Sequence, residues 1–156
     1  MTETVLKAEP GSHELSVTRD VAGSPELVYR CFVEPELMSR WLGPRQYETK
    51  VDVWDVRHGG QWRYVSVADG QAHGFRGVFH GDPSVTAGIT QTWEYEGAPG
   101  FPSIQKATFE AIPTGTRITL TDVHLTVQAR DMHLAAGMEG GMRESFERMD
   151  ELLAGL

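Results

Sequence analysis

Two short helices, one directly after the other, are predicted between residues 24 and 44. Ser24 suits the N-cap of the first helix, because its hydroxyl can accept a hydrogen bond from a free backbone N–H, and Pro25 suits the first helical position. The same pattern restarts at Pro35. Gly43-Pro44 ends the second helix, since proline disfavours helical conformation in the residue before it. A helix pair this short cannot bury its own apolar side, so it must pack against a larger element.

The middle of the chain, from Tyr47 to about Thr126, alternates apolar and polar residues with a period of two. This pattern is typical of strands with one buried face, and turn sequences such as Asp69-Gly70 and Gly81 to Ser84 separate the strands. Because the turns are short, the six strands are predicted to form an antiparallel meander. A further strand, around Leu15 to Val21, precedes the helix pair.

Helical spacing returns from Leu134 to Leu156, where one apolar side is formed by Met138, Met142, Phe146, Met149 and Leu153. We expect this helix to lie across the concave side of the sheet, with the space between them either packed or left as a cavity. The predicted class is α+β: a curved seven-strand antiparallel sheet, two short helices and a long C-terminal helix. Residues 1–13 are expected to be a flexible segment or an extra edge strand, and residues 14–156 one domain.

Composition excludes several classes of protein. A chain of 156 residues fits one domain, and its formal net charge of −8 argues against nucleic acid and anionic membrane surfaces as partners. Cys31 is the only cysteine, so neither an intrachain disulfide nor a thiolate metal cluster can form. No apolar run approaches the about 20 residues of a membrane span, and the N-terminus lacks the pattern of a secretion signal. We therefore expect a cytoplasmic protein without membrane insertion; a homodimer is left open.

Five segments together resemble a known family: VYRCFVEPELMSRWLGP at 28–44, DVRHGGQWRY at 55–64, HGFRGVF at 73–79, TQTWEY at 90–95 and GMEGGMRESFERMDELL at 137–153. In this order they resemble the START-like (SRPBCC) superfamily, and within it the bacterial homologues of the activator of the heat-shock protein ninety ATPase. The resemblance implies the helix-grip fold. It leaves function open, since the superfamily includes hydrophobic-ligand binders, polyketide cyclases, self-resistance proteins and stress-related proteins. The family usually has Trp where this chain has Met142, so we expect a pocket shape of its own.

Aromatic and methionine side chains around a few polar groups are typical of a small-molecule pocket, although the same residues could simply fill a core. The resemblance favours the pocket. Gln91 supports it, because a buried amide needs hydrogen-bond partners or a ligand. The predicted ligand-binding residues are Trp41, Trp62, Tyr64, Phe79, Gln91, Trp93, Tyr95, His124, Met138 and Met142.

Residues that carry chemistry are less evident. None of the six histidines shows a metal-ligand spacing such as an i, i+4 pair on a helix, so no metal and no cofactor are predicted. Cys31 lies in the apolar stripe of the first helix and is predicted to be a buried thiol rather than a nucleophile. No catalytic residue is predicted.

Three functions follow as alternatives. The first is non-enzymatic binding of a hydrophobic or aromatic small molecule between the sheet and the long helix. The second is an enzyme of the cyclase, aromatase or dehydratase type, whose candidate acid or base groups are His124, Gln91, Tyr64 and Arg117. The third is an interaction protein that modulates a chaperone ATPase; it ranks last because the sequence shows no exposed apolar stripe.

Overall fold

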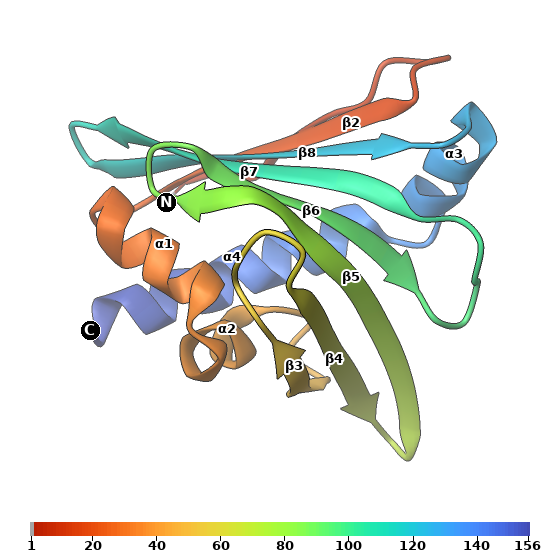
Figure 1. Cartoon of the computed structure of the whole chain (residues 1–156). Coiled ribbons are helices and arrows are strands. Elements are labelled where there is room, and N and C mark those ends of the chain that lie inside the picture. Colours follow the sequence, from red (N-terminus) through yellow and green to blue (C-terminus); the bar gives the residue numbers. More distant parts are fainter. Residues whose placement is uncertain (1) are drawn as a thin grey trace.

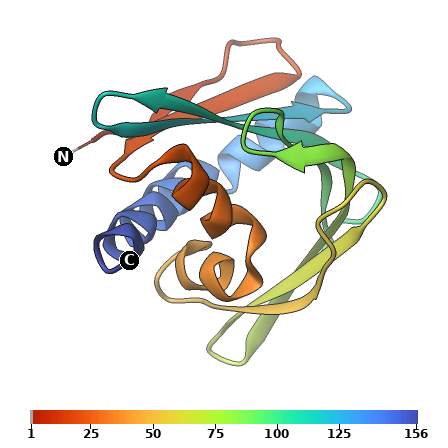
Figure 2. The same cartoon turned by 60° about the vertical axis from the view of Figure 1, so that its left-hand side comes forward.

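The computed structural model describes residues 2–156, in which one antiparallel sheet of eight strands curves around helices (Figures 1 and 2). The strands are ordered β1-β2-β8-β7-β6-β5-β4-β3, and the sheet is not closed. The elements are β1 (Val5–Lys7), β2 (Glu14–Val21), α1 (Pro25–Val33), α2 (Pro35–Trp41), β3 (Glu48–Trp54), β4 (Gln61–Ala68), β5 (Gln71–Ser84), β6 (Gly88–Tyr95), β7 (Ser103–Ile112), β8 (Gly115–His124), α3 (Val127–Ala135) and α4 (Met138–Ala154).

The helix pair forms as the sequence predicts. The Ser24 hydroxyl accepts a hydrogen bond from the Leu27 N–H at 3.2 Å, and α2 begins at Pro35 directly after α1. Trp41, at the end of α2, is buried and fixes the pair in two ways. Its indole N–H donates to the Cys31 carbonyl oxygen of α1 at 2.8 Å, and its ring stacks on Phe146 of α4. The two short helices are thereby tied both to each other and to the long helix.

Helix α4 lies on the concave side of the sheet together with α1 and α2 (Figure 2). Its apolar stripe faces the interior: Phe146 and Met149 are fully buried, and Met138 and Met142 are half-buried. Glu139 and Glu147 are exposed on the opposite side. The predicted α+β class, with an antiparallel sheet and a C-terminal helix across it, is confirmed.

Four details differ from the sequence prediction, and the first is the strand count. The sheet has eight strands rather than seven, because Val5–Lys7 pairs antiparallel with β2 as an edge strand. Leu6 of this strand packs against the core. The contact explains why so short a segment joins the sheet.

The second difference is the turn expected at Gly81 to Ser84. This segment belongs to β5, where the pairing with β6 shifts register between His80 and Ser84. Gly81 has φ +71°, which suits glycine and accommodates the irregularity. The chain turns only at residues 85–87. The hairpin at Asp69-Gly70 forms as predicted, with φ of 50° and 77° as a type I′ turn requires.

The third difference is a separate helix, α3, before α4. Thr126 caps it by accepting a hydrogen bond from the Ala129 N–H at 3.0 Å, and Gly137, at φ +88°, separates it from α4. The sequence of α3, VQARDMHLA, has no continuous apolar stripe, which is why helical periodicity did not reveal it. In Figure 1, α3 lies at the end of β8.

The fourth difference is on the outer face. Ile104 and Val123 lie directly opposite each other on β7 and β8 and are 54% and 41% exposed, and Leu125 beyond them is also exposed. The sequence pattern did not single out this exposed apolar pair. Among residues 2–156, no helix combines the length and the apolar content that crossing a bilayer requires.

Candidate functional site

A cavity of about 280 Å³ lies between the concave face of the sheet and helices α2 and α4. Strand periodicity builds its aromatic wall. On β4 every second residue points inward, so that Trp62, Tyr64 and Ser66 are all buried there. The rings of Trp62 and Tyr64 stack with centroids 5.6 Å apart, and Phe75 of β5 continues the row. The wall is therefore made mainly of stacked aromatic faces.

Seven of the ten residues predicted to bind a ligand line this cavity: Trp41, Trp62, Tyr64, Gln91, Trp93, Met138 and Met142. The other three lie outside its wall. Phe79 packs against Trp54 with ring centroids 5.7 Å apart, and the Tyr95 hydroxyl lies 2.7 Å from Nδ1 of His73. His124 is buried next to the wall, beside His133. That any of the ten contacts a ligand stays a prediction.

The four residues named as candidate acid or base groups are not all in one place. Gln91 and Tyr64 line the cavity, and His124 lies next to it. Arg117 does not, because the inward positions of β8 are the even-numbered ones, Leu120 and Asp122 among them. Its guanidinium instead binds the Asp20 carboxylate at 2.9 Å in a partly exposed ion pair. The prediction that Arg117 lies in the cavity is therefore wrong.

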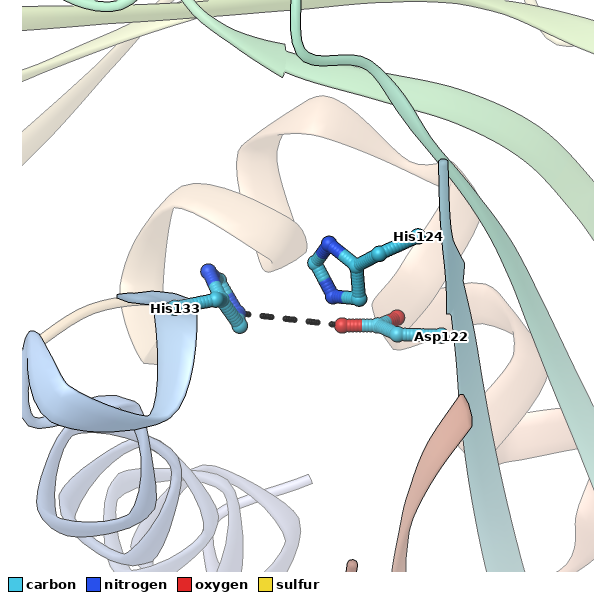
Figure 3. Close-up of side chains that lie close together, drawn as sticks. All are labelled: Asp122, His124 and His133. Carbon is cyan, nitrogen blue, oxygen red and sulfur yellow. Dashed lines mark ion pairs between the residues drawn. The ribbon is translucent and has the colours of Figure 1, made fainter. Parts of the chain in front are cut away.

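Three polar side chains come together where β8 passes into α3 (Figure 3), a place that we call the polar end of the cavity. Asp122 and His124 point to the same side of β8 because they are two residues apart, and His133 approaches them from α3. Nε2 of His133 lies 3.8 Å from Oδ2 of Asp122, and the two imidazole centroids are 5.1 Å apart. Asp122 and His133 are part of the cavity wall, as are the nearby amides Gln91 and Gln105.

Sequence reasoning missed Asp122 and His133 as site residues. Asp122 had a usable signal, since it shares strand parity with Leu120 and with the predicted His124. His133 had none, because its helix was not predicted. The three residues meet only because the chain turns directly from β8 into α3.

Burial dominates the electrostatics of this cluster. It raises the pKa of Asp122 to about 7, against a smaller opposing effect of a hydrogen bond with Gln105. Burial also lowers the pKa of His133 to about 4, with a further contribution from His124, and lowers the pKa of His124, with a contribution from Arg130. A buried charge is costly without compensation, so the neutral forms are favoured. Near pH 7 the His133 imidazole is neutral, and its contact with Asp122 is not an ion pair.

Two polar atoms of this region are unpaired. Nε2 of His124 and Oγ of Ser103 are buried and have no hydrogen-bond partner among residues 2–156. His124 and Ser103 lie directly opposite each other on β8 and β7. Buried polar atoms are normally hydrogen-bonded, so an unpaired nitrogen beside a cavity marks a place where a ligand could bind.

The sequence profile of the family described as "Activator of Hsp90 ATPase homolog 1-like protein" matches residues 22–154. The chain belongs to this family. The match confirms the resemblance drawn from the five sequence segments. No curated protein matches the chain.

Solved structures similar to this AHSA1-like chain support the fold alone. A Rhodobacter sphaeroides protein is 24% identical, with a TM-score of 0.87 over 97% of this chain and 99% of that one. A Mycobacterium smegmatis protein is 19% identical, with the same TM-score over 97% of each chain. An AHSA1 protein from Silicibacter pomeroyi is 22% identical, with a TM-score of 0.73 over 90% of this chain and 97% of that one.

Proposed function

We propose that this AHSA1-like protein binds one small molecule in the cavity between the sheet and α4, and that the molecule has an apolar or aromatic body with a polar group at one end. The observation that carries the proposal is the cavity itself, about 280 Å³ in volume and walled by the rings of Trp62, Tyr64, Phe75 and Trp93. This volume is near the lower limit of about 300 Å³ for ligand pockets, which favours a compact ligand.

The polar end of the cavity supports an amphipathic ligand. Gln91 and Gln105 face each other across β6 and β7, but their amide contact is long, at 3.5 Å. Together with Asp122 and His133, these amides offer donors and acceptors on one side of an otherwise apolar space. A few convergent polar groups in an apolar pocket are what orients a small ligand. The proposed ligand therefore has its hydrogen-bonding group toward β8 and its ring toward β4.

Binding can be tested in two steps. Native mass spectrometry of the purified protein should detect any bound molecule at one per chain. Titration with an apolar fluorescent dye should give saturable one-to-one binding to the native state, and Met142→Trp should weaken it because a larger ring takes up cavity volume.

The matched control is Met132→Trp, which adds the same ring at a position on α3 that is 72% exposed and should leave binding unchanged. Dye binding that is insensitive to Met142→Trp, or that is lost in Ile104→Ser, would place the dye on the outer surface and contradict the proposal.

A second candidate is an interaction role, as the family description suggests. The exposed pair Ile104 and Val123 offers an apolar contact on the outer face, and Leu125, just after β8, is exposed as well. The test is the ATPase rate of an Hsp90-type chaperone with and without this protein. Stimulation that disappears in the Ile104→Ser, Val123→Ser double variant would support this role, and an unchanged rate would exclude it for that chaperone. A cyclase-type activity stays an alternative prediction.

A further inference from the structure

We propose that Asp122, His124 and His133 form a binding site for one divalent first-row transition-metal ion, such as Zn²⁺, at the polar end of the cavity. The histidine spacing in the sequence does not reveal this site, because fixed ligand spacing indicates only sites built on a single element. Here the ligands come from a strand and from a helix that the sequence pattern did not reveal.

The distances between the candidate ligand atoms support the site. One ligand atom from each residue lies within 4.8 Å of the other two. An ion held at about 2.1 Å from nitrogen and oxygen requires its ligand atoms to be no more than about 4 Å apart. Nε2 of His133 and Oδ2 of Asp122, at 3.8 Å, already meet this limit. Small side-chain rotations of the two histidines would complete the set.

The burial of the cluster supports the metal site independently of these distances. Asp122 and His124 are 7% and 5% exposed, and Nε2 of His124 has no hydrogen-bond partner among the described residues. Leaving a buried nitrogen unpaired is costly, whereas coordination would satisfy it. In a surface cluster of the same residues, water would satisfy this nitrogen.

The donor set selects the class of ion. Two imidazoles and one carboxylate suit Zn²⁺, Co²⁺, Ni²⁺ or Fe²⁺, whereas Mg²⁺ and Ca²⁺ prefer oxygen ligands throughout. Three protein ligands leave at least one position open, as in sites where a metal also binds a small molecule. Since Asp122 and His133 line the cavity, that position would face it. If the proposed function holds, the metal would receive the polar group of the ligand.

The positive charge of Arg130, near the cluster, disfavours the binding of a cation. Arg130 is buried on α3, close enough to influence His124. Its guanidinium is already held, however: it donates to the Asp131 carboxylate at 2.8 Å and to the carbonyl oxygens of Glu9 and Glu14 at 2.8 and 3.0 Å. These contacts offset much of its charge, so the cluster keeps its capacity for a cation.

The test uses the full-length protein stripped with a chelator and titrated calorimetrically with Zn²⁺, with no organic ligand present. We expect one ion per chain and a higher melting temperature with Zn²⁺. Co²⁺ should give visible absorption bands typical of nitrogen coordination. Asp122→Asn and His133→Gln should each weaken binding by at least about tenfold, since each removes or weakens one ligand. His133 is only half-buried, so its variant tests the site even if Asp122→Asn alters folding.

The matched control is the His58→Ala, His80→Ala double variant. It removes the other close histidine pair, whose exposed rings lie 6.0 Å apart, and should bind Zn²⁺ like the wild type. Absence of stoichiometric binding to the wild type, or binding that survives both cluster variants and is lost in the control, would overturn the proposal. Because dye binding is measured separately, failure of the metal site leaves the proposed function intact, and the reverse also holds.

Discussion

The imidazole of His133 on α3 meets the indole of Trp93 on β6 edge to face, with ring centroids 5.2 Å apart. This contact lies where the polar end of the cavity meets its aromatic wall, because both residues line the cavity. Trp93 also stacks on Phe75 at 5.5 Å, so the wall is continuous from α3 to β5. A ligand oriented by the polar end would lie against this indole.

The first prediction uses that arrangement. Trp93→Phe should keep the aromatic wall, and so keep ligand or dye affinity close to that of the wild type. It should reduce the change in tryptophan fluorescence on binding, because the indole nearest the polar end is gone. A titration that follows tryptophan and ligand signals separately would check this. A full tryptophan response in the variant would place the ligand away from β6.

The second prediction concerns Trp41, which is 2% exposed between α1, α2 and α4. Trp41→Ala should lower the free energy of unfolding by about 3–5 kcal/mol, since it removes a buried ring and leaves a cavity. Trp41→Phe should cost much less, because it retains stacking on Phe146 but loses the hydrogen bond to the Cys31 carbonyl, worth about 1 kcal/mol. Urea denaturation measures both. If the two substitutions lower the free energy of unfolding equally, the Trp41 ring does not stabilise the helices by packing.

The elements that the sequence predicted well are those whose own residues determine them. Pro25 and Pro35 mark helix starts because their ring suits the first turn, and the alternation of Trp62, Tyr64 and Ser66 indicates a strand with one buried face. These signals are local, so they can be read without knowledge of the rest of the fold.

The site depends instead on contacts between distant elements. Asp122 and His133 meet through the turn from β8 into α3, a helix with no amphipathic pattern of its own. Whether Trp62 and Met142 fill a core or line a cavity is equally invisible in the sequence, because the same apolar pattern serves both. Only the distance between sheet and helix decides it.

The third prediction concerns the thiol of Cys31, which is fully buried in α1. Burial raises the pKa of this thiol above its usual range, and the thiolate is the reactive form. In the native protein, an aromatic disulfide reagent should therefore react only as fast as the chain opens. In denaturant it should titrate one thiol per chain at once. Fast, complete reaction under native conditions would show that α1 detaches from the core.

The last prediction concerns a buried cation beneath the long helix. Arg19 of β2 is 3% exposed; its guanidinium donates to the Asp150 carboxylate of α4 and, at 3.0 Å, to the Thr4 hydroxyl. Asp150→Ala would leave this charge poorly compensated, and charged hydrogen bonds contribute about 1.5–3 kcal/mol each. Because Asp150 is itself 39% exposed, water can replace part of the lost contact. We therefore expect a loss of about 2 kcal/mol in unfolding free energy.

Glu147→Ala, on the exposed side of the same helix, is the matched control and should change stability by less than about 0.5 kcal/mol. Arg19→Met removes the buried charge but keeps a side chain of similar length. In this variant no buried cation requires a carboxylate partner. In the Arg19→Met background, Asp150→Ala should cost little. If it still costs about 2 kcal/mol there, Asp150 stabilises α4 by some other contact and the Arg19 pair is not the cause.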